Sequence, residues 1–144
     1  MLRFASPILL ALSVLSFPAA AQKDSVRREE AEARLLSCEA LTGDDRQWCE
    51  MARKRFPEDY AKAWQGDYQA QRNVAYMLGR QSYGAVRVDP IEGCAWRWVI
   101  STSGHPSAGT GDTSNLQMEC GKLSQTEQQI ARARADRIMA GIHR

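Results

Sequence analysis

The chain has 144 residues, of which 44% are hydrophobic and 25% are charged, and its formal net charge is +2. This composition excludes an intrinsically disordered protein. The near balance of charges also argues against a nucleic-acid-binding protein, which normally carries a basic excess on one face.

The first 21 residues have the pattern of a cleaved secretory signal peptide. Arg3 supplies a positive charge, the apolar run Ile8–Phe17 is too short to span a bilayer, and Ala19–Ala21 forms a small-residue cleavage site. We expect cleavage before Gln22, with an uncleaved anchor as the alternative. The pattern is typical of a bacterial Sec signal and predicts a periplasmic or secreted mature chain without membrane insertion.

Two helices are predicted in residues 22–65. The apolar spacing favours a helix over Ser25–Leu41 with Ser25 as its N-cap, ended by Gly43. A second helix is predicted over Arg46–Phe56 and should stop at Pro57, followed by a short helical turn over Glu58–Trp64. Residues 22–65 would then form an N-terminal helical hairpin.

The four cysteines form an even set in an exported chain, which predicts two structural disulfides. Their spacings lack the CxxC pairs of zinc and redox sites, so metal binding and free thiols are the minor alternatives. Cys38 and Cys49 lie at similar distances on either side of the turn at Gly43, which favours their pairing in a helical hairpin. This leaves Cys94 for Cys120.

A central helix pair is predicted over residues 66–104. The first helix, Asp67–Arg80, has Ala70, Val74, Met77 and Leu78 on one face. The second helix runs from Pro90 to about Ser103, because Asp89 can cap it and proline is favoured at the first helical position. Gly104 should end it.

These residues resemble one Sel-one-like repeat, a variant of the tetratricopeptide repeat, over residues 66–108. The resemblance places structural roles on a set of mostly small residues and one tryptophan: Gly66, Ala70, Gln71, Val74, Ala75, Gly84, Val86, Asp89, Gly93, Trp96, Gly104 and Ala108. In such repeats small residues let two helices touch, and tryptophan fills the gap beside them. The resemblance implies an all-α, short α-solenoid of antiparallel helix pairs, with residues 22–65 as a degenerate capping repeat.

The C-terminal part, residues 109–144, is predicted to cap this solenoid with two further helices. A Gly-rich loop over Ala108–Thr113 should precede a short helix over Ser114–Cys120. Ser124 and Glu127 form a capping box that begins the last helix, which runs to about Ile142 with Ile130, Ala131, Ala135, Ile138 and Met139 on its apolar side. Antiparallel packing across the loop would bring Cys94 to Cys120.

Tyr68, Arg72 and Tyr76 share a face of the helix 67–80 that its apolar residues leave free, and they are the candidate protein-binding residues. The alternative is that Arg46–Phe56 or the C-terminal helix covers this stripe.

No pattern in the sequence indicates catalysis, a metal or a cofactor. Ser103, His105, Ser107 and Asp112 are interpreted as turn residues and not as a Ser-His-Asp site. The four tryptophans are expected in the core and not in a carbohydrate platform. We therefore expect a monomeric, non-enzymatic module that binds an unidentified envelope protein and no nucleic acid. The alternatives are a structural accessory of an envelope complex, a peptidoglycan-associated factor or a small hydrolase.

Overall fold

A computed structural model describes residues 19–80 and 84–142, so most of the predicted signal peptide lies outside the described residues. Six helices and no strand occur in these two ranges, which confirms the predicted all-α class. The helices are α1 (Ala19–Glu32), α2 (Gly43–Trp64), α3 (Tyr68–Gly79), α4 (Pro90–Thr102), α5 (Thr110–Cys120) and α6 (Gln125–Ile142).

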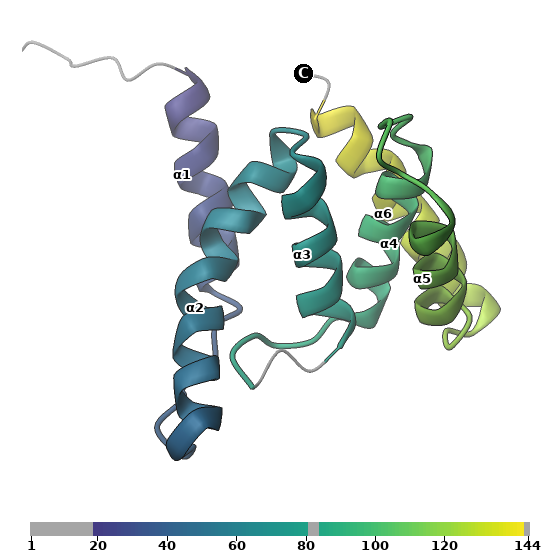
Figure 1. Ribbon diagram of the computed structural model, residues 1–144. Coiled ribbons are helices and arrows are strands. Elements are labelled where there is room, and N and C mark those ends of the chain that lie inside the picture. Colours follow the sequence, from purple (N-terminus) through teal and green to yellow (C-terminus); the bar gives the residue numbers. More distant parts are fainter. Residues whose placement is uncertain (1–18, 81–83, 143–144) are drawn as a thin grey trace, which may run out of the picture.

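Helices α2, α3 and α4 lie side by side in the order of the sequence, as Figure 1 shows. Helix α1 packs on α2, whereas α5 and α6 both pack on α4. The first half of α2 projects away from the other helices (Figure 1). Helix α4 therefore occupies the centre of the arrangement and contributes more buried residues than any other helix described.

Both predicted disulfides are confirmed. Cys38 bonds to Cys49 with their Cα atoms 5.9 Å apart, and Cys94 bonds to Cys120 with a Cα separation of 5.1 Å. The first bond ties the connection between α1 and α2 to α2 itself, and the second ties α4 to α5. Each closes a covalent loop in a small chain, which stabilises the folded state mainly by restricting the unfolded one.

The end of α1 was predicted wrongly, because the helix stops at Glu32 and not at Leu41. The next residues pair instead with the connection between α3 and α4: Leu36 N–H donates to the Ala85 carbonyl, and Arg87 N–H donates to the Arg34 carbonyl, both at 2.9 Å. Ser25 is not an N-cap, since it lies inside α1. Local helix preference is overridden here by backbone hydrogen bonds to a distant segment.

Helix α2 was also predicted wrongly, since it begins at Gly43 and passes through Pro57 to Trp64. Proline inside a helix removes one backbone hydrogen bond and usually bends the axis, and α2 is visibly bent in Figure 1. The side chains of Phe56, Pro57 and Tyr60 are all buried around this point. Their burial offsets the lost hydrogen bond, so the helix 46–56 and the turn 58–64 are one element.

The central pair, α3 and α4, matches its prediction closely. Asp67 caps α3 by accepting from Ala70 N–H at 2.7 Å, and Asp89 caps α4 by accepting from Glu92 N–H at 3.0 Å. Gly66, Gly84 and Gly104 all have positive φ angles, which glycine adopts at little cost. Three of the four glycines of the repeat pattern thus form turns around this pair, whereas Gly93 lies inside α4.

Trp96 fills the centre of the core and is 0% exposed. Its ring meets Trp64 edge-on at a centroid distance of 5.6 Å and Tyr60 at 6.3 Å. Edge-to-face arrangements of this kind are favourable beyond the apolar area that they bury. The expectation that all four tryptophans lie in the core is wrong for Trp48, whose side chain is 48% exposed.

The C-terminal helices differ from their prediction in two places. Helix α5 begins at Thr110, so most of the expected loop 108–113 is helical. The apolar side of α6 buries Ala131, Ala135 and Ile138 but leaves Ile130 42% exposed. The capping box of α6 is confirmed, since Ser124 N–H donates to Glu127 and Glu127 N–H donates to Ser124 Oγ.

Candidate binding surface

Helix α3 presents Tyr68, Arg72 and Tyr76 on one face, but these residues differ in exposure. Tyr76 is 43% exposed, whereas Tyr68 and Arg72 are half-buried. They are covered in part by the beginning of α5, a neighbour that was not expected there, because the sequence suggested a loop at this point. The open part of the predicted stripe is therefore its C-terminal end.

Asp112 of α5 holds the covered part of the stripe. It is buried, accepts a hydrogen bond from the Tyr68 hydroxyl and forms an ion pair with Arg72, whose Nε lies 3.2 Å from Oδ1. The hydrogen bond to Asp112 is the main reason that the pKa of Tyr68 is raised, since loss of the proton would put two negative charges together. Tyr68 and Arg72 thus also fasten α3 to α5.

His105 contributes to the same contact between α3 and the beginning of α5. Its ring stacks on Tyr68 with a centroid distance of 4.3 Å and an interplanar angle of 3°, and its Nδ1 accepts from Ser107 N–H at 3.1 Å. Asp112 meanwhile turns toward Tyr68 and Arg72. His105 and Ser107 therefore build the turn before α5, and Asp112 fixes that turn to α3.

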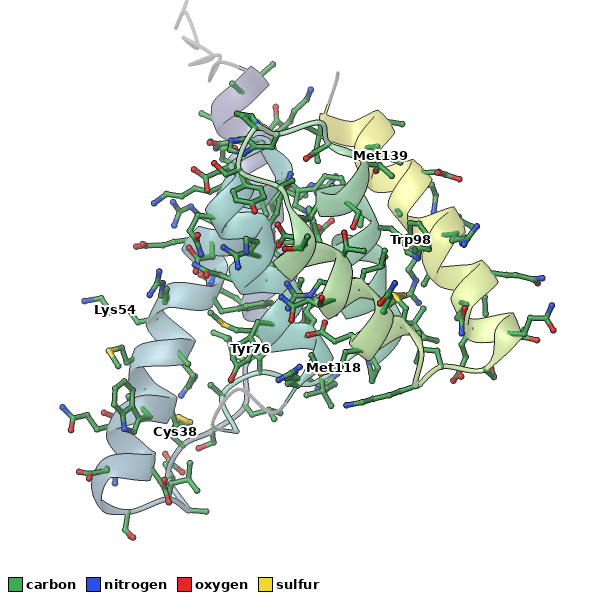
Figure 2. All side chains as sticks on the ribbon, turned by 45° about the vertical axis from the view of Figure 1, so that its right-hand side comes forward. Cys38, Lys54, Tyr76, Trp98, Met118 and Met139 are labelled. Carbon is green, nitrogen blue, oxygen red and sulfur yellow. A yellow bond between two sulfur atoms is a disulfide. The ribbon has the colours of Figure 1, made fainter. Side chains whose placement is uncertain are left out.

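A shallow groove of about 280 Å³ runs between α3 and α5, next to the contacts of Asp112 with Tyr68 and Arg72. Pockets that enclose small organic ligands usually measure about 300–1,000 Å³. We call its exposed rim the α3–α5 face, made of Arg72, Asn73 and Tyr76 from α3, Arg80 directly after α3, and Asn115 and Met118 from α5. Figure 2 shows Tyr76 and Met118 on this part of the molecule. The groove is therefore smaller than a pocket that encloses a small organic ligand.

The floor of the groove is a buried ion pair between Arg97 of α4 and Glu119 of α5. Arg97 is 4% exposed and Glu119 is 6% exposed, and two parallel hydrogen bonds of 2.9 Å join the guanidinium to the carboxylate. Bidentate pairs of this kind combine strength with a fixed geometry. The sequence interpretation missed both residues, although Arg97 lies one turn after Cys94 and Glu119 directly precedes Cys120, so the predicted disulfide indicated their proximity.

Arg80 connects the buried ion pair to the exposed rim of the groove. Its Nε lies 3.4 Å from Glu119 Oε1, its Nη2 lies 3.2 Å from the sulfur of Met118, and its guanidinium sits 5.9 Å from the ring centre of Tyr76. The exposed tyrosine and methionine are therefore connected to the buried floor through one arginine. This arrangement holds the α3–α5 face in a defined shape.

A second polar cluster lies away from this groove, where the segment after α1 meets α2, α4 and α6. Arg34 Nη2 lies 2.6 Å from Glu92, the Tyr60 hydroxyl donates to Glu92 at 3.1 Å, and Arg134 Nη1 lies 2.9 Å from Asp89. Burial and the nearby Glu92 charge raise the pKa of Tyr60 to about 12. Arg34, Tyr60 and Asp89 also line a cleft of about 700 Å³. The groups of the cluster satisfy one another, so they tie the segment after α1 to α2, α4 and α6.

Within residues 19–80 and 84–142, no three side chains of the kinds that bind metals gather in one place. No helix in the described ranges is both long and apolar enough to cross a membrane. Comparison with known protein families, with characterised proteins and with solved structures gives no match for this chain.

Proposed function

We propose that this protein is a non-enzymatic helical-repeat module of the bacterial envelope that binds another protein through its α3–α5 face. The observation that carries the proposal is the exposed Tyr76, with Arg80 and Met118 beside it, above the buried Arg97–Glu119 pair. Tyrosine and arginine dominate the energetics of many protein interfaces because they combine a large contact area with directional hydrogen bonds. A rigid floor lowers the entropy lost when a partner docks.

The packing of the helices supports a Sel-one-like repeat over residues 66–108. Helices α3 and α4 form the closest pair, α5 and α6 follow on α4, and the close contacts of Gly93 and the burial of Trp96 suit the roles that the repeat pattern gives them. In this account residues 22–65 and 109–144 act as degenerate capping units. Helices α3 and α5, which lie on either side of α4 in the sequence, line one common surface.

The two disulfides support export to an oxidising compartment. Disulfides rarely persist in the bacterial cytoplasm, where thiol reductants keep cysteines reduced. Together with the signal-peptide pattern, they favour a mature chain that starts at Gln22 and works in the periplasm or outside the cell.

The experiment that tests the proposal is affinity capture from a solubilised envelope extract with three versions of the mature protein. Wild type is compared with Tyr76→Ala and with Ile130→Ala, which removes an equally exposed side chain from α6. We expect wild type and Ile130→Ala to retain the same defined protein and Tyr76→Ala to lose it. Retention by all three, or sedimentation of the protein with purified peptidoglycan sacculi in place of a protein partner, would contradict the proposal.

A further inference from the structure

We infer that the α3–α5 face recognises an extended acidic segment of its partner, in which two carboxylates four residues apart flank an apolar side chain. The inference rests on the proposed function and specifies the chemistry of the partner.

The positive charges at the groove are accessible to a partner, whereas the negative charges are buried. Arg72 and Arg80 each leave 38% of the side chain exposed at the rim. The carboxylates that hold them, Asp112 and Glu119, are each only 5% exposed and lie beneath. With Arg97 included, three arginines share these two carboxylates. An incoming chain therefore meets guanidinium groups and a positive excess, which favours carboxylates.

The spacing of the two accessible arginines selects the form of the ligand. Arg72 lies in α3 and Arg80 directly follows the last residue of α3, eight positions later, which corresponds to about 12 Å between their backbone positions along the helix axis at ~1.5 Å per residue. An extended chain rises about 3.3 Å per residue and directs alternate side chains to the same side. Carboxylates at positions i and i+4 of such a chain lie about 13 Å apart on one side, so the two spacings agree.

Tyr76 stands midway between the two arginines in sequence, one helical turn from each. In an extended ligand the side chain at i+2 points to the same side as the two carboxylates, and it would meet the exposed ring of Tyr76 and the neighbouring Met118. Both of these side chains are apolar over most of their surface. The middle position of the recognised segment is therefore apolar.

Both arginines are also held in place in the unbound protein. Arg72 pairs with Asp112 and lies 5.6 Å from the ring centre of Tyr68, and Arg80 contacts Glu119 and Met118. Because these contacts restrict the guanidinium groups beforehand, binding a carboxylate requires less ordering of flexible side chains.

The test measures fluorescence anisotropy of three labelled peptides at low salt with the folded, disulfide-bonded protein. Their central sequences are Glu-Ser-Leu-Ser-Glu, Lys-Ser-Leu-Ser-Lys and Ser-Glu-Leu-Glu-Ser, so the second reverses the charge and the third shortens the carboxylate spacing. We expect the first peptide to bind most tightly, the third about fivefold more weakly, and the second not at all. Raising the salt concentration should weaken the first peptide's binding.

Two variants locate the binding site. Arg80→Gln removes a rim arginine while Arg97 still pairs with Glu119, and it should weaken the first peptide about fivefold. Arg137→Gln removes an exposed arginine of α6 and should change nothing. Equal binding of the three peptides, or equal loss in both variants, would overturn the inference. If no acidic peptide binds while Tyr76→Ala still loses the captured envelope protein, acid recognition is refuted and the proposed function stands.

Discussion

Gly93 of α4 lies directly against Gly79 of α3, so that a Cβ atom added at position 93 would stand 2.7 Å from both the Cα and the backbone nitrogen of Gly79. Real Cβ atoms essentially never approach so closely. Gly79 is in turn covered by Glu119, whose carboxylate oxygen would stand 2.9 Å from a Cβ at position 79. The contact between two glycines therefore allows the close crossing of α3 and α4, and Glu119 of the groove floor packs against the same point.

Gly93→Ala should destabilise the protein, because the added methyl group meets backbone atoms that cannot move aside without separating two helices. Overpacking of this kind typically costs about 1–3 kcal/mol. Urea unfolding followed by circular dichroism measures the loss. The matched control is Gly111→Ala in α5, where a Cβ would have no neighbour within 4 Å and stability should be unchanged or slightly higher. Two variants of equal stability would contradict the packing described here.

The two disulfides should stabilise the protein by similar amounts but with different local consequences. The loops span 11 and 26 residues of separation, for which restriction of the unfolded chain predicts about 3 kcal/mol each. Replacing Cys38 and Cys49 by serine should release the connection between α1 and α2, which hydrogen exchange would detect. Replacing Cys94 and Cys120 should leave α5 protected, because Arg97 still binds Glu119.

Rapid hydrogen exchange throughout α5 in the second variant would show that the ion pair does not hold the helix. Peptide mapping without reduction tests the pairing itself. It should yield Cys38 linked to Cys49 and Cys94 linked to Cys120, and a peptide that links Cys38 to Cys94 would contradict the fold.

The start of α6 should weaken in acid. Hydrogen bonds from the backbone and side chain of Ser124 lower the pKa of Glu127 below its ordinary value, so the charged carboxylate is favoured in the folded state. Its contribution to stability is complete above the ordinary glutamate pKa of about 4.3 and disappears as the pH falls through the lowered folded value. The difference in melting temperature between wild type and Glu127→Ala should therefore shrink below about pH 4. A difference that is independent of pH between 3 and 7 would exclude this cap.

Features that depend on neighbouring residues could be predicted from the sequence. The cap Asp89 and the capping box at Ser124 are local, since a side chain satisfies an amide three residues further on. Asp67 was placed inside the predicted helix, whereas it is the cap of α3. The pairing of Cys94 with Cys120 followed from helices that turn back on one another. The pairing of Cys38 with Cys49 was predicted correctly, but from a helical hairpin that does not form there, because Cys38 lies in the connection after α1.

Features that depend on distant residues were missed. Helix α1 ends early because Leu36 bonds to Ala85, and α2 continues through Pro57 because the residues around it are buried. At the candidate site, the sequence could place Tyr68, Arg72 and Tyr76 on one face of α3, but it could not show that Asp112 binds the first two. For this reason, changing all three to alanine would disturb the packing of α5, and Tyr76 alone is the suitable residue for testing binding.

Site-specific photo-crosslinking in living cells tests the binding role of the α3–α5 face most directly. Benzoylphenylalanine is placed at position 76 or, as the matched control, at position 130, where the natural side chains are 43% and 42% exposed on different helices. Both variants should melt like wild type, since exposed positions tolerate substitution. We expect one defined protein adduct from position 76 and none from position 130. No adduct from position 76, or the same adducts from both positions, would contradict it.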